Sequence, residues 1–277
     1  MADVHPQRRS EGAVGPLLQH WRKARQLSQL ALATEAGVSS RHVCFIETGR
    51  AKPSREMVLL LSRVLDVPLR ERNTLLLAAG LAPQFEETAL DAPTLEAVRG
   101  ALDAILEQQE PFPAVVMNRY WDIVRTNRAA AGFFGFMLEG QRLRESSNVL
   151  RLMFHPDGLK PFVSNWELVA EGLLRRAQRE AIGGVKDQRT QQLLREILEY
   201  PGTPPALGRQ TSDVIAASVP VIPVSFVRGA RNYDFFSTVT TLGTPHDITA
   251  QEIRIECFFP ANPGTAERAR SELAGDR

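Results

Sequence analysis

Residues 29–52 combine arginine, lysine, serine, threonine and glutamine with one phenylalanine in a short stretch. Arginine can donate two hydrogen bonds to the O6 and N7 atoms of guanine, and a phenylalanine ring can pack against a thymine methyl group. Arg41 and Phe45 are the candidates for these two contacts. The cations, hydroxyls and amide beside them can bond phosphates. The predicted DNA-binding set is Gln29, Ser39, Ser40, Arg41, Phe45, Thr48, Arg50 and Lys52.

The distribution of charge favours a polyanion partner for the same end of the chain. The 277 residues carry a formal net charge of +1, but residues 1–83 hold 12 Lys and Arg against 7 Asp and Glu. Residues 84–277 hold 21 against 25. A basic excess confined to one end indicates where a nucleic acid would bind.

Enzymatic and metal chemistry find little support in the residue types. None of the five histidines begins an HExxH motif, and the GxSxG and GxxxxGK[ST] motifs are absent. His155 lies in a turn-like HPD segment, and His246 beside Asp247 has no nucleophile placed by the sequence. Two cysteines, Cys44 and Cys257, are too few for a zinc site or a disulfide framework. We therefore predict no catalytic residue, no metal and no cofactor.

Five short helices are predicted to position the DNA-binding residues. Helical patterns cover residues 15–25, 29–37, 40–48, 55–66 and 69–79. Ser28, Ser39 and Ser54 precede the second, third and fourth of them as N-cap residues, and Gly37 suits a tight turn. A three-residue turn between the second and third helices is typical of a helix-turn-helix domain, whose third helix enters the major groove.

The faces of these helices follow from about 100° of rotation per residue. Val43 and Ile46 share the inner face of the third helix and are expected to pack against the second helix. Val38 joins this core, and the partners expected from the second helix are Leu30, Ala33 and Ala36. The basic residues expected on the outer face of the first helix are Arg22, Lys23 and Arg25. The alternative is a five-helix packing unit whose charges are only solvated.

The remainder of the chain changes from helical to strand-like patterns. An acidic segment after Pro83 and an amphipathic helix that closes at Pro111 form a connector. Strands are predicted at 113–118, 122–126, 221–227, 234–242 and 252–259, and helices at 128–138, 166–181 and 188–198, with a short turn at 150–154. This pattern predicts an α+β domain whose sheet has one face covered by helices.

Aromatic side chains in this half exceed what a thin core needs, which favours a cavity. Arginines on or beside the predicted strands can pair with a ligand carboxylate. The candidate ligand-binding residues are Arg119, Trp121, Arg125, Phe133, Phe134, Met153, Phe154, Trp166, Phe226, Arg228 and Phe235. Plain core packing is the alternative for each aromatic residue, and a surface salt bridge is the alternative for each arginine.

Two groups of segments resemble known families. The stretch LSQLALATEAGVSSRHVCFIETGRAKPS resembles the Cro/C1-type (XRE) helix-turn-helix. The segments PAVVMNRYWDIVRTNRAAAGFFG and DFFSTVTTLGTPHDITAQEIRIECFFPAN are similar to the MmyB-like ligand-binding domain, which has a PAS-like sheet. The resemblance implies a bacterial ligand-responsive transcription regulator, with a fatty acid as the ligand suggested for some members. It gives Glu47 a bracing role and assigns DNA contacts to Gln29, Ser39, Ser40, Arg41 and Phe45.

These observations predict a multidomain chain. Its parts are a flexible tail (1–14), an all-α five-helix helix-turn-helix domain (15–83), a linker (84–110), an α+β PAS-like domain with an antiparallel sheet (111–262) and a C-terminal tail (263–277). We expect a cytoplasmic homodimer that binds double-stranded operator DNA and a small apolar ligand, with fatty acids as the suggested class. No apolar run reaches the ~18 residues of a membrane span, so no membrane partner is expected. The alternative keeps the DNA-binding domain and makes the C-terminal half a dimerisation or protein-docking module.

Overall fold

The computed structural model describes residues 14–139, 146–182, 187–204, 221 and 223–273. The chain divides into two compact units, one made of residues 1–87 with 245–251 and the other of residues 88–244 with 252–277. The predicted flexible tail, except for Val14, lies outside the described residues. Val14 itself is the first residue of a helix.

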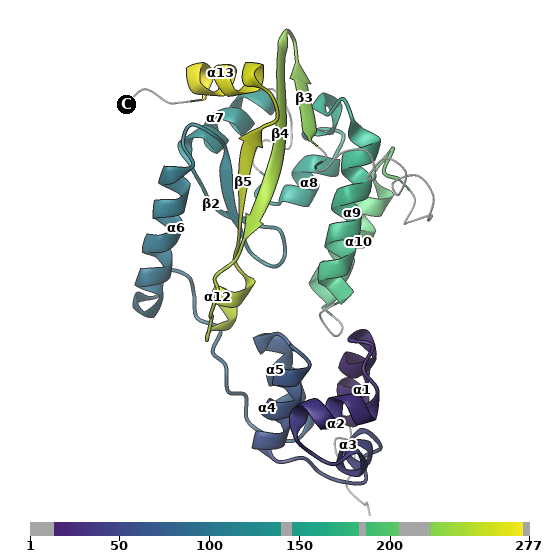
Figure 1. Cartoon of the computed structure of the whole chain (residues 1–277). Helices are drawn as coiled ribbons and strands as arrows, with labels where there is room; N and C mark the ends of the chain where they lie inside the picture. Colours follow the sequence, from purple (N-terminus) through teal and green to yellow (C-terminus); the bar gives the residue numbers. More distant parts are fainter. Residues whose placement is uncertain (1–13, 140–145, 183–186, 205–220, 222, 274–277) are drawn as a thin grey trace, which may run out of the picture. The chain divides into compact units, whose positions relative to one another are not determined.

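The first unit contains the five helices that the sequence predicts, coloured purple to blue in Figure 1. They are α1 (Val14–Ala24), α2 (Gln29–Ala36), α3 (Ser40–Glu47), α4 (Arg55–Val64) and α5 (Leu69–Ala78).

Hydrogen-bonding serines and one glycine define the turn between α2 and α3. The Oγ atom of Ser28 accepts a hydrogen bond from the Ala31 amide at 3.0 Å, and that of Ser39 accepts one from the His42 amide at 3.2 Å. Gly37 ends α2 with a φ of 66°, in the left-handed region that favours glycine. The predicted helix-turn-helix geometry is therefore confirmed.

The core of this unit matches the predicted inner face of α3 but not all of the predicted partners. Val43, Ile46 and Ala33 are each 1% exposed. Leu30, in contrast, is 66% exposed, so its predicted burial is wrong, and Leu32 is fully buried in α2 instead. The reason is helical phase, because Leu30 lies about 110° away from the centre of the buried face of α2.

Residues 245–251 complete the first unit through α12 (Ile248–Glu252), a helix that the sequence analysis does not predict. The α5 helix begins after Pro68 without a side-chain cap from its own neighbours. Gln251 supplies one, since its Oε1 atom accepts a hydrogen bond from the Leu69 amide at 2.7 Å. The Ile248 amide donates to the carbonyl oxygen of Glu86 at 2.9 Å.

The second unit is built on an antiparallel sheet with the strand order β2–β1–β5–β4–β3 (Figure 1). The strands are β1 (Ala114–Met117), β2 (Ile123–Thr126), β3 (Val224–Arg228), β4 (Arg231–Thr240) and β5 (Arg254–Pro260). The five predicted strands are therefore present. In β5, Glu256 is paired with Val115 of β1 and with Val239 of β4, so β5 lies between these strands.

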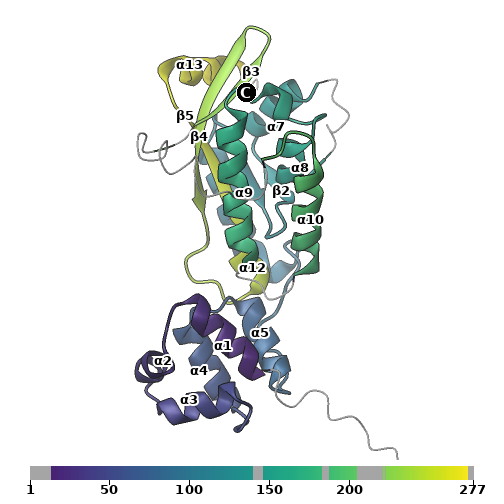
Figure 2. The ribbon, with the colours of Figure 1, turned by 90° about the vertical axis from the view of Figure 1, so that its right-hand side faces the viewer.

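Helices pack on both faces of this sheet, so the predicted one-sided cover is wrong. On one face, Val116, Ile253 and Ile255 pack against Leu102 and Leu106 of α6 (Glu96–Gln108), which follows a short 3-10 turn, η1 (Pro93–Leu95). On the other face lie most of the remaining helices (Figures 1 and 2). They are α7 (Arg128–Met137), α8 (Val149–Phe154), α9 (Trp166–Ile182) and α10 (Gln188–Glu199), with the 3-10 turn η2 (Lys160–Phe162).

The predicted C-terminal tail contains a ten-residue helix, α13 (Pro263–Glu272). Asn262 caps it, since its Oδ1 atom accepts a hydrogen bond from the Thr265 amide at 2.8 Å. Ala269 and Leu273 are buried in the core of the second unit. This segment is therefore part of the folded domain through Leu273. None of the helices in the described ranges is long and apolar enough to cross a membrane.

Candidate DNA-binding surface and ligand cavity

The outer face of α3 and the loop after it carry most of the predicted DNA-binding residues. Gln29 and Phe45 are half-buried, and the others are exposed. The exposed members are Ser39, Ser40, Arg41, Thr48, Arg50 and Lys52. Ser39 also serves as the N-cap of α3, so its hydroxyl is already engaged with backbone.

Phe45 holds two of the predicted cations close together. The guanidinium carbon of Arg41 lies 5.1 Å from the centroid of the Phe45 ring, and that of Arg50 lies 6.0 Å from it. A cation over an aromatic face is attracted by the ring quadrupole. The ring therefore restricts both arginines before any partner binds, which lowers the entropy cost of ordering them.

A buried ion pair braces α1 against α3. The guanidinium of Arg22 donates from Nε and Nη2 to the two carboxylate oxygens of Glu47 at 2.7 and 2.8 Å. Gln29 Nε2 also donates to Glu47 at 2.8 Å. Burial acts to raise the pKa of Glu47, but the hydrogen bonds from Arg22 and Gln29 outweigh it and hold that pKa below its ordinary value. The bracing position of Glu47 agrees with the family resemblance. The predicted outward position of Arg22 is wrong, because its guanidinium is buried in the ion pair with Glu47.

Close approach of the same two helices depends on Gly15. A Cβ atom at this position would lie 2.5 Å from the carbonyl oxygen of Glu47. Only glycine avoids that overlap, so the interhelical distance that lets Arg22 reach Glu47 requires Gly15.

An apolar cavity of about 50 Å³ lies inside the second unit, between the sheet and the helices. Five of the predicted ligand-binding residues line it: Phe133, Phe134, Met153, Phe226 and Phe235. The other lining residues are not among the predicted ligand-binding residues. These are Pro113, Val115, Val149, Leu152, Leu159, Leu173, Val224, Glu256 and Phe258.

The other predicted aromatic residues lie elsewhere in the same domain. Phe154 is fully buried and packs edge-on against Trp166, with ring centroids 5.0 Å apart. Trp166 donates from Nε1 to the Gly202 carbonyl oxygen at 2.9 Å. Trp121 is 1% exposed in the turn between β1 and β2. None of the three is among the described residues that line the cavity.

Trp121 is stacked against two arginines and has a φ of 66°, which is rare for a residue with a side chain. The guanidinium carbons of Arg176 and Arg254 lie 4.6 and 5.0 Å from its ring centroid. Burial and the neighbouring Arg176 lower the pKa of Arg254 to about 10. These contacts hold the turn in a conformation that costs roughly 1 to 3 kcal/mol.

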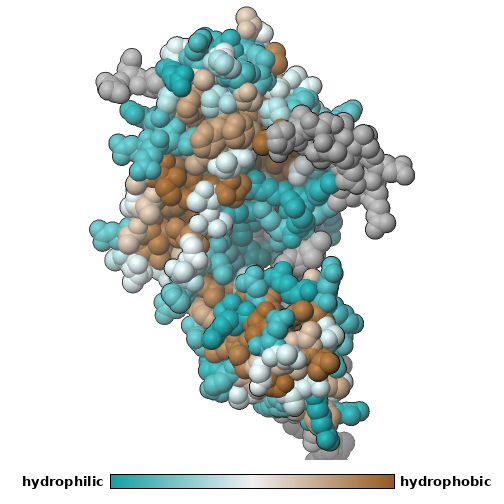
Figure 3. All heavy atoms as spheres, in the orientation of Figure 1, coloured by the Kyte–Doolittle hydropathy of each residue, from teal (hydrophilic) through white to brown (hydrophobic). Residues whose placement is uncertain are grey.

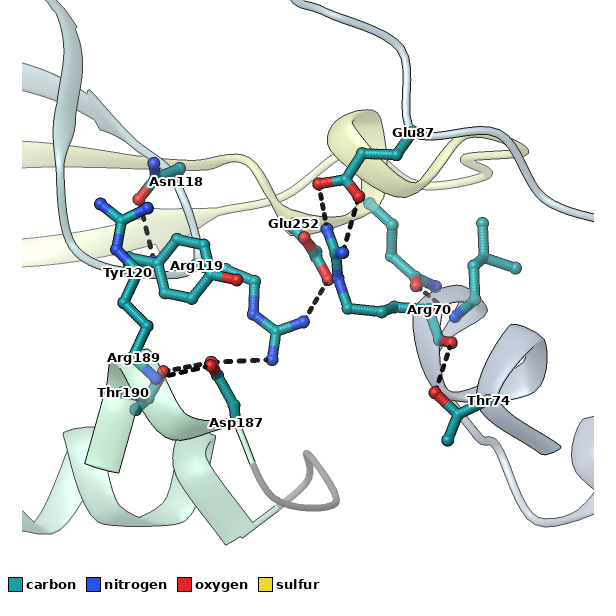
Figure 4. Close-up of polar contacts among 12 residues, drawn as sticks. Arg70, Thr74, Glu87, Asn118, Arg119, Tyr120, Asp187, Arg189, Thr190 and Glu252 are labelled. Carbon is teal, nitrogen blue, oxygen red and sulfur yellow. Dashed lines mark hydrogen bonds and ion pairs between the residues drawn. The ribbon is translucent and has the colours of Figure 1, made fainter. Parts of the chain in front are cut away.

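The predicted arginines make ion pairs rather than facing the cavity. Arg119 donates to Glu252 at 2.8 Å and to Asp187 at 3.2 Å, in the polar cluster shown in Figure 4. Arg125 pairs with Asp103 of α6. In the same cluster the ring of Tyr120 lies 5.3 Å from the guanidinium carbon of Arg119.

Arg228, the third predicted arginine, also lies beside an acid, with its Nη2 atom 3.9 Å from Glu139 Oε2. Its Nη2 atom donates to the carbonyl oxygen of Glu139 at 2.9 Å. Its guanidinium carbon lies 5.2 and 5.4 Å from the ring centroids of Phe136 and Phe162. It does not belong to the lining of the cavity either.

Metal chemistry has no site in the part of the chain that the structure describes. No group of three or more His, Cys, Asp or Glu residues there is arranged to hold an ion. The arrangement therefore consists of an exposed polar and basic helix face in one unit and an apolar cavity in the other.

A helix-turn-helix unit joined to a cavity-bearing α+β domain defines a class of protein, the ligand-binding transcription regulators. Comparison with protein families agrees with this architecture. Residues 18–72 match the helix-turn-helix family model, and residues 98–271 match the model of the MmyB-like transcription regulator ligand binding domain. The chain belongs to the family that carries this ligand-binding domain. Both models describe domains of transcription regulators rather than enzymes.

Other comparisons add little. No curated protein matches the chain. A solved structure described as "Structure of an RNA-binding Light-Oxygen-Voltage Receptor" is similar over 96% of this chain and 63% of that chain, with 12% identity and a TM-score of 0.25. The chain thus spans less than two thirds of that structure's length, and a TM-score of 0.25 is too low to indicate a shared fold.

Proposed function

We propose that the protein is a cytoplasmic regulator that binds operator DNA in the major groove as a homodimer and changes its DNA affinity when a small apolar molecule fills the cavity. One observation carries the proposal. A single chain joins a helix-turn-helix unit with an outward basic face to a domain with an internal apolar cavity. DNA binding alone would not require the cavity.

The DNA-binding part rests on the exposed side chains of α3. Arg41 and Phe45 are side by side and suit a guanine followed or preceded by a thymine. Arg50 and Lys52 are exposed cations on the loop after α3 and suit phosphates. Selection of a binding site from random DNA would identify the operator. Fluorescence anisotropy on that operator should then give a log K that falls with log salt by about 0.9 for each neutralised phosphate. A slope near zero on every DNA would contradict DNA binding.

A homodimer is proposed because a single recognition helix is long enough to contact only one half of an operator. One recognition helix reads a half-site, and two copies related by a two-fold axis read a palindromic operator. The face of the sheet that carries α6 offers a surface for the second copy. Phe236 and Phe259 stack there with centroids 5.6 Å apart, and both are only half-buried, as are Val98 and Ile105 of α6. Figure 3 shows apolar side chains gathered on this side of the domain.

Light scattering of the purified chain would test this surface. The wild type should have the mass of a dimer, and Phe236→Asp should shift it towards the monomer because a buried charge opposes association. Val124→Asp, at an exposed position in edge strand β2, is the matched control and should leave the dimer intact. A monomeric wild type, or a dimer that tolerates Phe236→Asp, would contradict the assignment.

The ligand proposal rests on the lining of the cavity. Nearly all of its walls are aliphatic or aromatic, which suits an apolar molecule. A fatty acid is the class that the family resemblance suggests. A volume of about 50 Å³ has room for only a few water-sized groups, so a long alkyl chain would require lining side chains to move.

The chain itself connects the cavity with the DNA-binding unit. β5 contributes Glu256 and Phe258 to the cavity wall. Its N-terminal end follows α12 directly, and α12 belongs to the DNA-binding unit through Gln251. The last residue of α12, Glu252, pairs with Arg119 of the ligand-binding domain. We propose that a shift of β5 on ligand binding is passed along this continuous segment.

A further inference from the structure

The cavity of the ligand-binding domain has one charged wall residue, and it is an acid. Glu256 projects from the middle of β5 and is 7% exposed. The other described lining residues are aliphatic, aromatic, methionine or proline, so no cationic side chain faces the cavity among them. A buried carboxylate in an apolar wall is costly unless it is paired.

Two donors fix the position of this carboxylate. Ser237 Oγ, on the adjacent strand β4, donates to Glu256 Oε1 at 2.6 Å. Arg176 Nη1, on α9, donates to Glu256 Oε2 at 3.0 Å. The Nε atom of Arg176 donates to Glu180 at 3.1 Å, and its guanidinium stacks on Trp121. Glu256 is therefore held at the end of a network that runs from α9 to the sheet.

The network leaves acceptor capacity on Glu256. An ionised carboxylate has about four lone-pair directions, and Ser237 and Arg176 occupy two of them. Because the rest of the wall presents apolar side chains, a polar group on a ligand in this cavity has Glu256 as its side-chain partner among the described residues. That partner accepts hydrogen bonds and donates none.

We propose that the ligand of this cavity carries a neutral hydrogen-bond donor, such as a hydroxyl, that donates to Glu256. This inference rests on the proposed ligand-sensing function and, within it, favours a neutral alcohol over the fatty acid that the family resemblance suggests. A ligand carboxylate has no proton to donate, so its oxygens would face the remaining acceptor positions of Glu256 without a hydrogen bond in a medium of low dielectric constant. A ligand ammonium would be buried close to Arg176, which already neutralises Glu256. An aliphatic alcohol is the simplest molecule that meets these conditions.

Isothermal titration of the full chain with 1-octanol and with octanoate at pH 8 tests the assignment, because the two probes differ only in the head group. We expect the alcohol to bind at least about tenfold more tightly, since octanoate would bury its carboxylate against acceptor oxygens without a hydrogen bond. Glu256→Gln should reduce the preference for the alcohol by about tenfold or more, because the glutamine amide can donate a hydrogen bond to octanoate whereas the Glu256 carboxylate cannot. Glu180→Gln is the matched control. It removes a different partner of Arg176 outside the cavity wall and should leave the preference unchanged.

The outcomes separate this inference from the proposed function. Octanoate binding as tightly as octanol to the wild type, or a preference that persists in a folded Glu256→Gln variant, would overturn the donor assignment and leave ligand sensing intact. Binding of neither probe would overturn ligand sensing itself. If Glu256→Gln does not fold, Ser237→Ala replaces it. This change frees one lone pair on Glu256, so the preference for octanol should be kept or increased, and its loss would overturn the assignment.

Discussion

Arg41 and Lys52 are both exposed cations, but their surroundings give them different expected roles. Arg41 is on α3 beside Phe45, whereas Lys52 is on the loop that follows. If Arg41 makes a bidentate contact with a base, Arg41→Ala should cost about 1 to 3 kcal/mol on the operator and relax selection at one base pair. Lys52→Ala should weaken binding to operator and random DNA alike. Anisotropy on both DNAs measures the difference, and an equal loss on both for Arg41→Ala would show that its role is electrostatic only.

The Glu47 carboxylate contributes to stability at the residue scale. Glu47→Gln would leave Arg22 buried without a charged partner and should cost about 3 to 5 kcal/mol in the free energy of unfolding. The pKa of Glu47 is lowered in the folded state, so the associated stability is present above the ordinary glutamate pKa of about 4.3 and is lost as the pH falls through the lower folded-state value.

Urea unfolding between pH 3 and pH 7 checks both statements. The wild type should lose stability below about pH 4 to 5, and Glu47→Gln should lack that part of the pH dependence. Glu35→Gln, at an exposed position of α2, is the control and should behave like the wild type. Equal stability of Glu47→Gln and the wild type at pH 7 would mean that the ion pair does not brace the domain.

At the scale of secondary-structure elements, α5 depends on a residue that is distant in sequence. Gln251 provides the acceptor for the first amide of α5. Gln251→Ala should lower the stability of the DNA-binding unit by about 1 kcal/mol, as for the loss of one capping hydrogen bond. Gln251→Glu keeps the acceptor and adds a negative charge at a helix N-terminus, so it should restore stability. Hydrogen exchange of the α5 amides measures the effect, and unchanged protection in Gln251→Ala would refute it.

The long helix α9 offers a way to fill the cavity from one side. Leu173 lines the cavity, so Leu173→Trp should narrow it and weaken binding of an apolar probe by about 1 to 3 kcal/mol. If occupancy sets DNA affinity, the variant should also hold one operator affinity whether or not ligand is present. Leu198→Trp adds the same bulk at an exposed position of α10 and should bind ligand normally. Unaltered ligand binding in Leu173→Trp would mean that the ligand lies elsewhere.

Elements with strong local signals were predictable, and those that depend on distant partners were not. Serine caps and Gly37 mark α2 and α3 directly in the sequence. The α12 helix has five residues, too few for a periodic pattern, and it is stabilised by contacts with Glu86 and Leu69. The α13 helix lies in the segment that the sequence analysis assigns to a C-terminal tail, although an asparagine cap followed by proline at the first helical position marks its start.

The candidate sites also differ in how far local sequence signals could predict them. The exposed face of α3 follows from helical phase, so its residues could be predicted. The cavity could be predicted only in part, because a wall residue and a core residue have the same apolar character. The sequence gives no sign that Glu256 belongs to a site, because its partner Arg176 is 80 positions away in the sequence.

For the whole molecule, a response to ligand requires a free-energy coupling between ligand binding and DNA binding. A ligand can shift DNA binding only if it binds the two states of the protein with different affinities, and the coupling is reciprocal. The continuous segment from Gln251 to Phe258 connects the DNA-binding unit with the cavity, so it is the part of the chain most able to carry this coupling. Typical couplings of ~1 to 3 kcal/mol correspond to about 5- to 150-fold changes in affinity.

Operator affinity measured with and without a cavity ligand reports the coupling between the two sites. Fluorescence anisotropy on the selected operator should be recorded for the delipidated protein, with saturating 1-octanol and with octanoate. We predict a shift in the dissociation constant of at least about fivefold with a molecule that binds the cavity, and no shift in Leu173→Trp. A molecule that binds the cavity by calorimetry yet leaves operator affinity unchanged would contradict it.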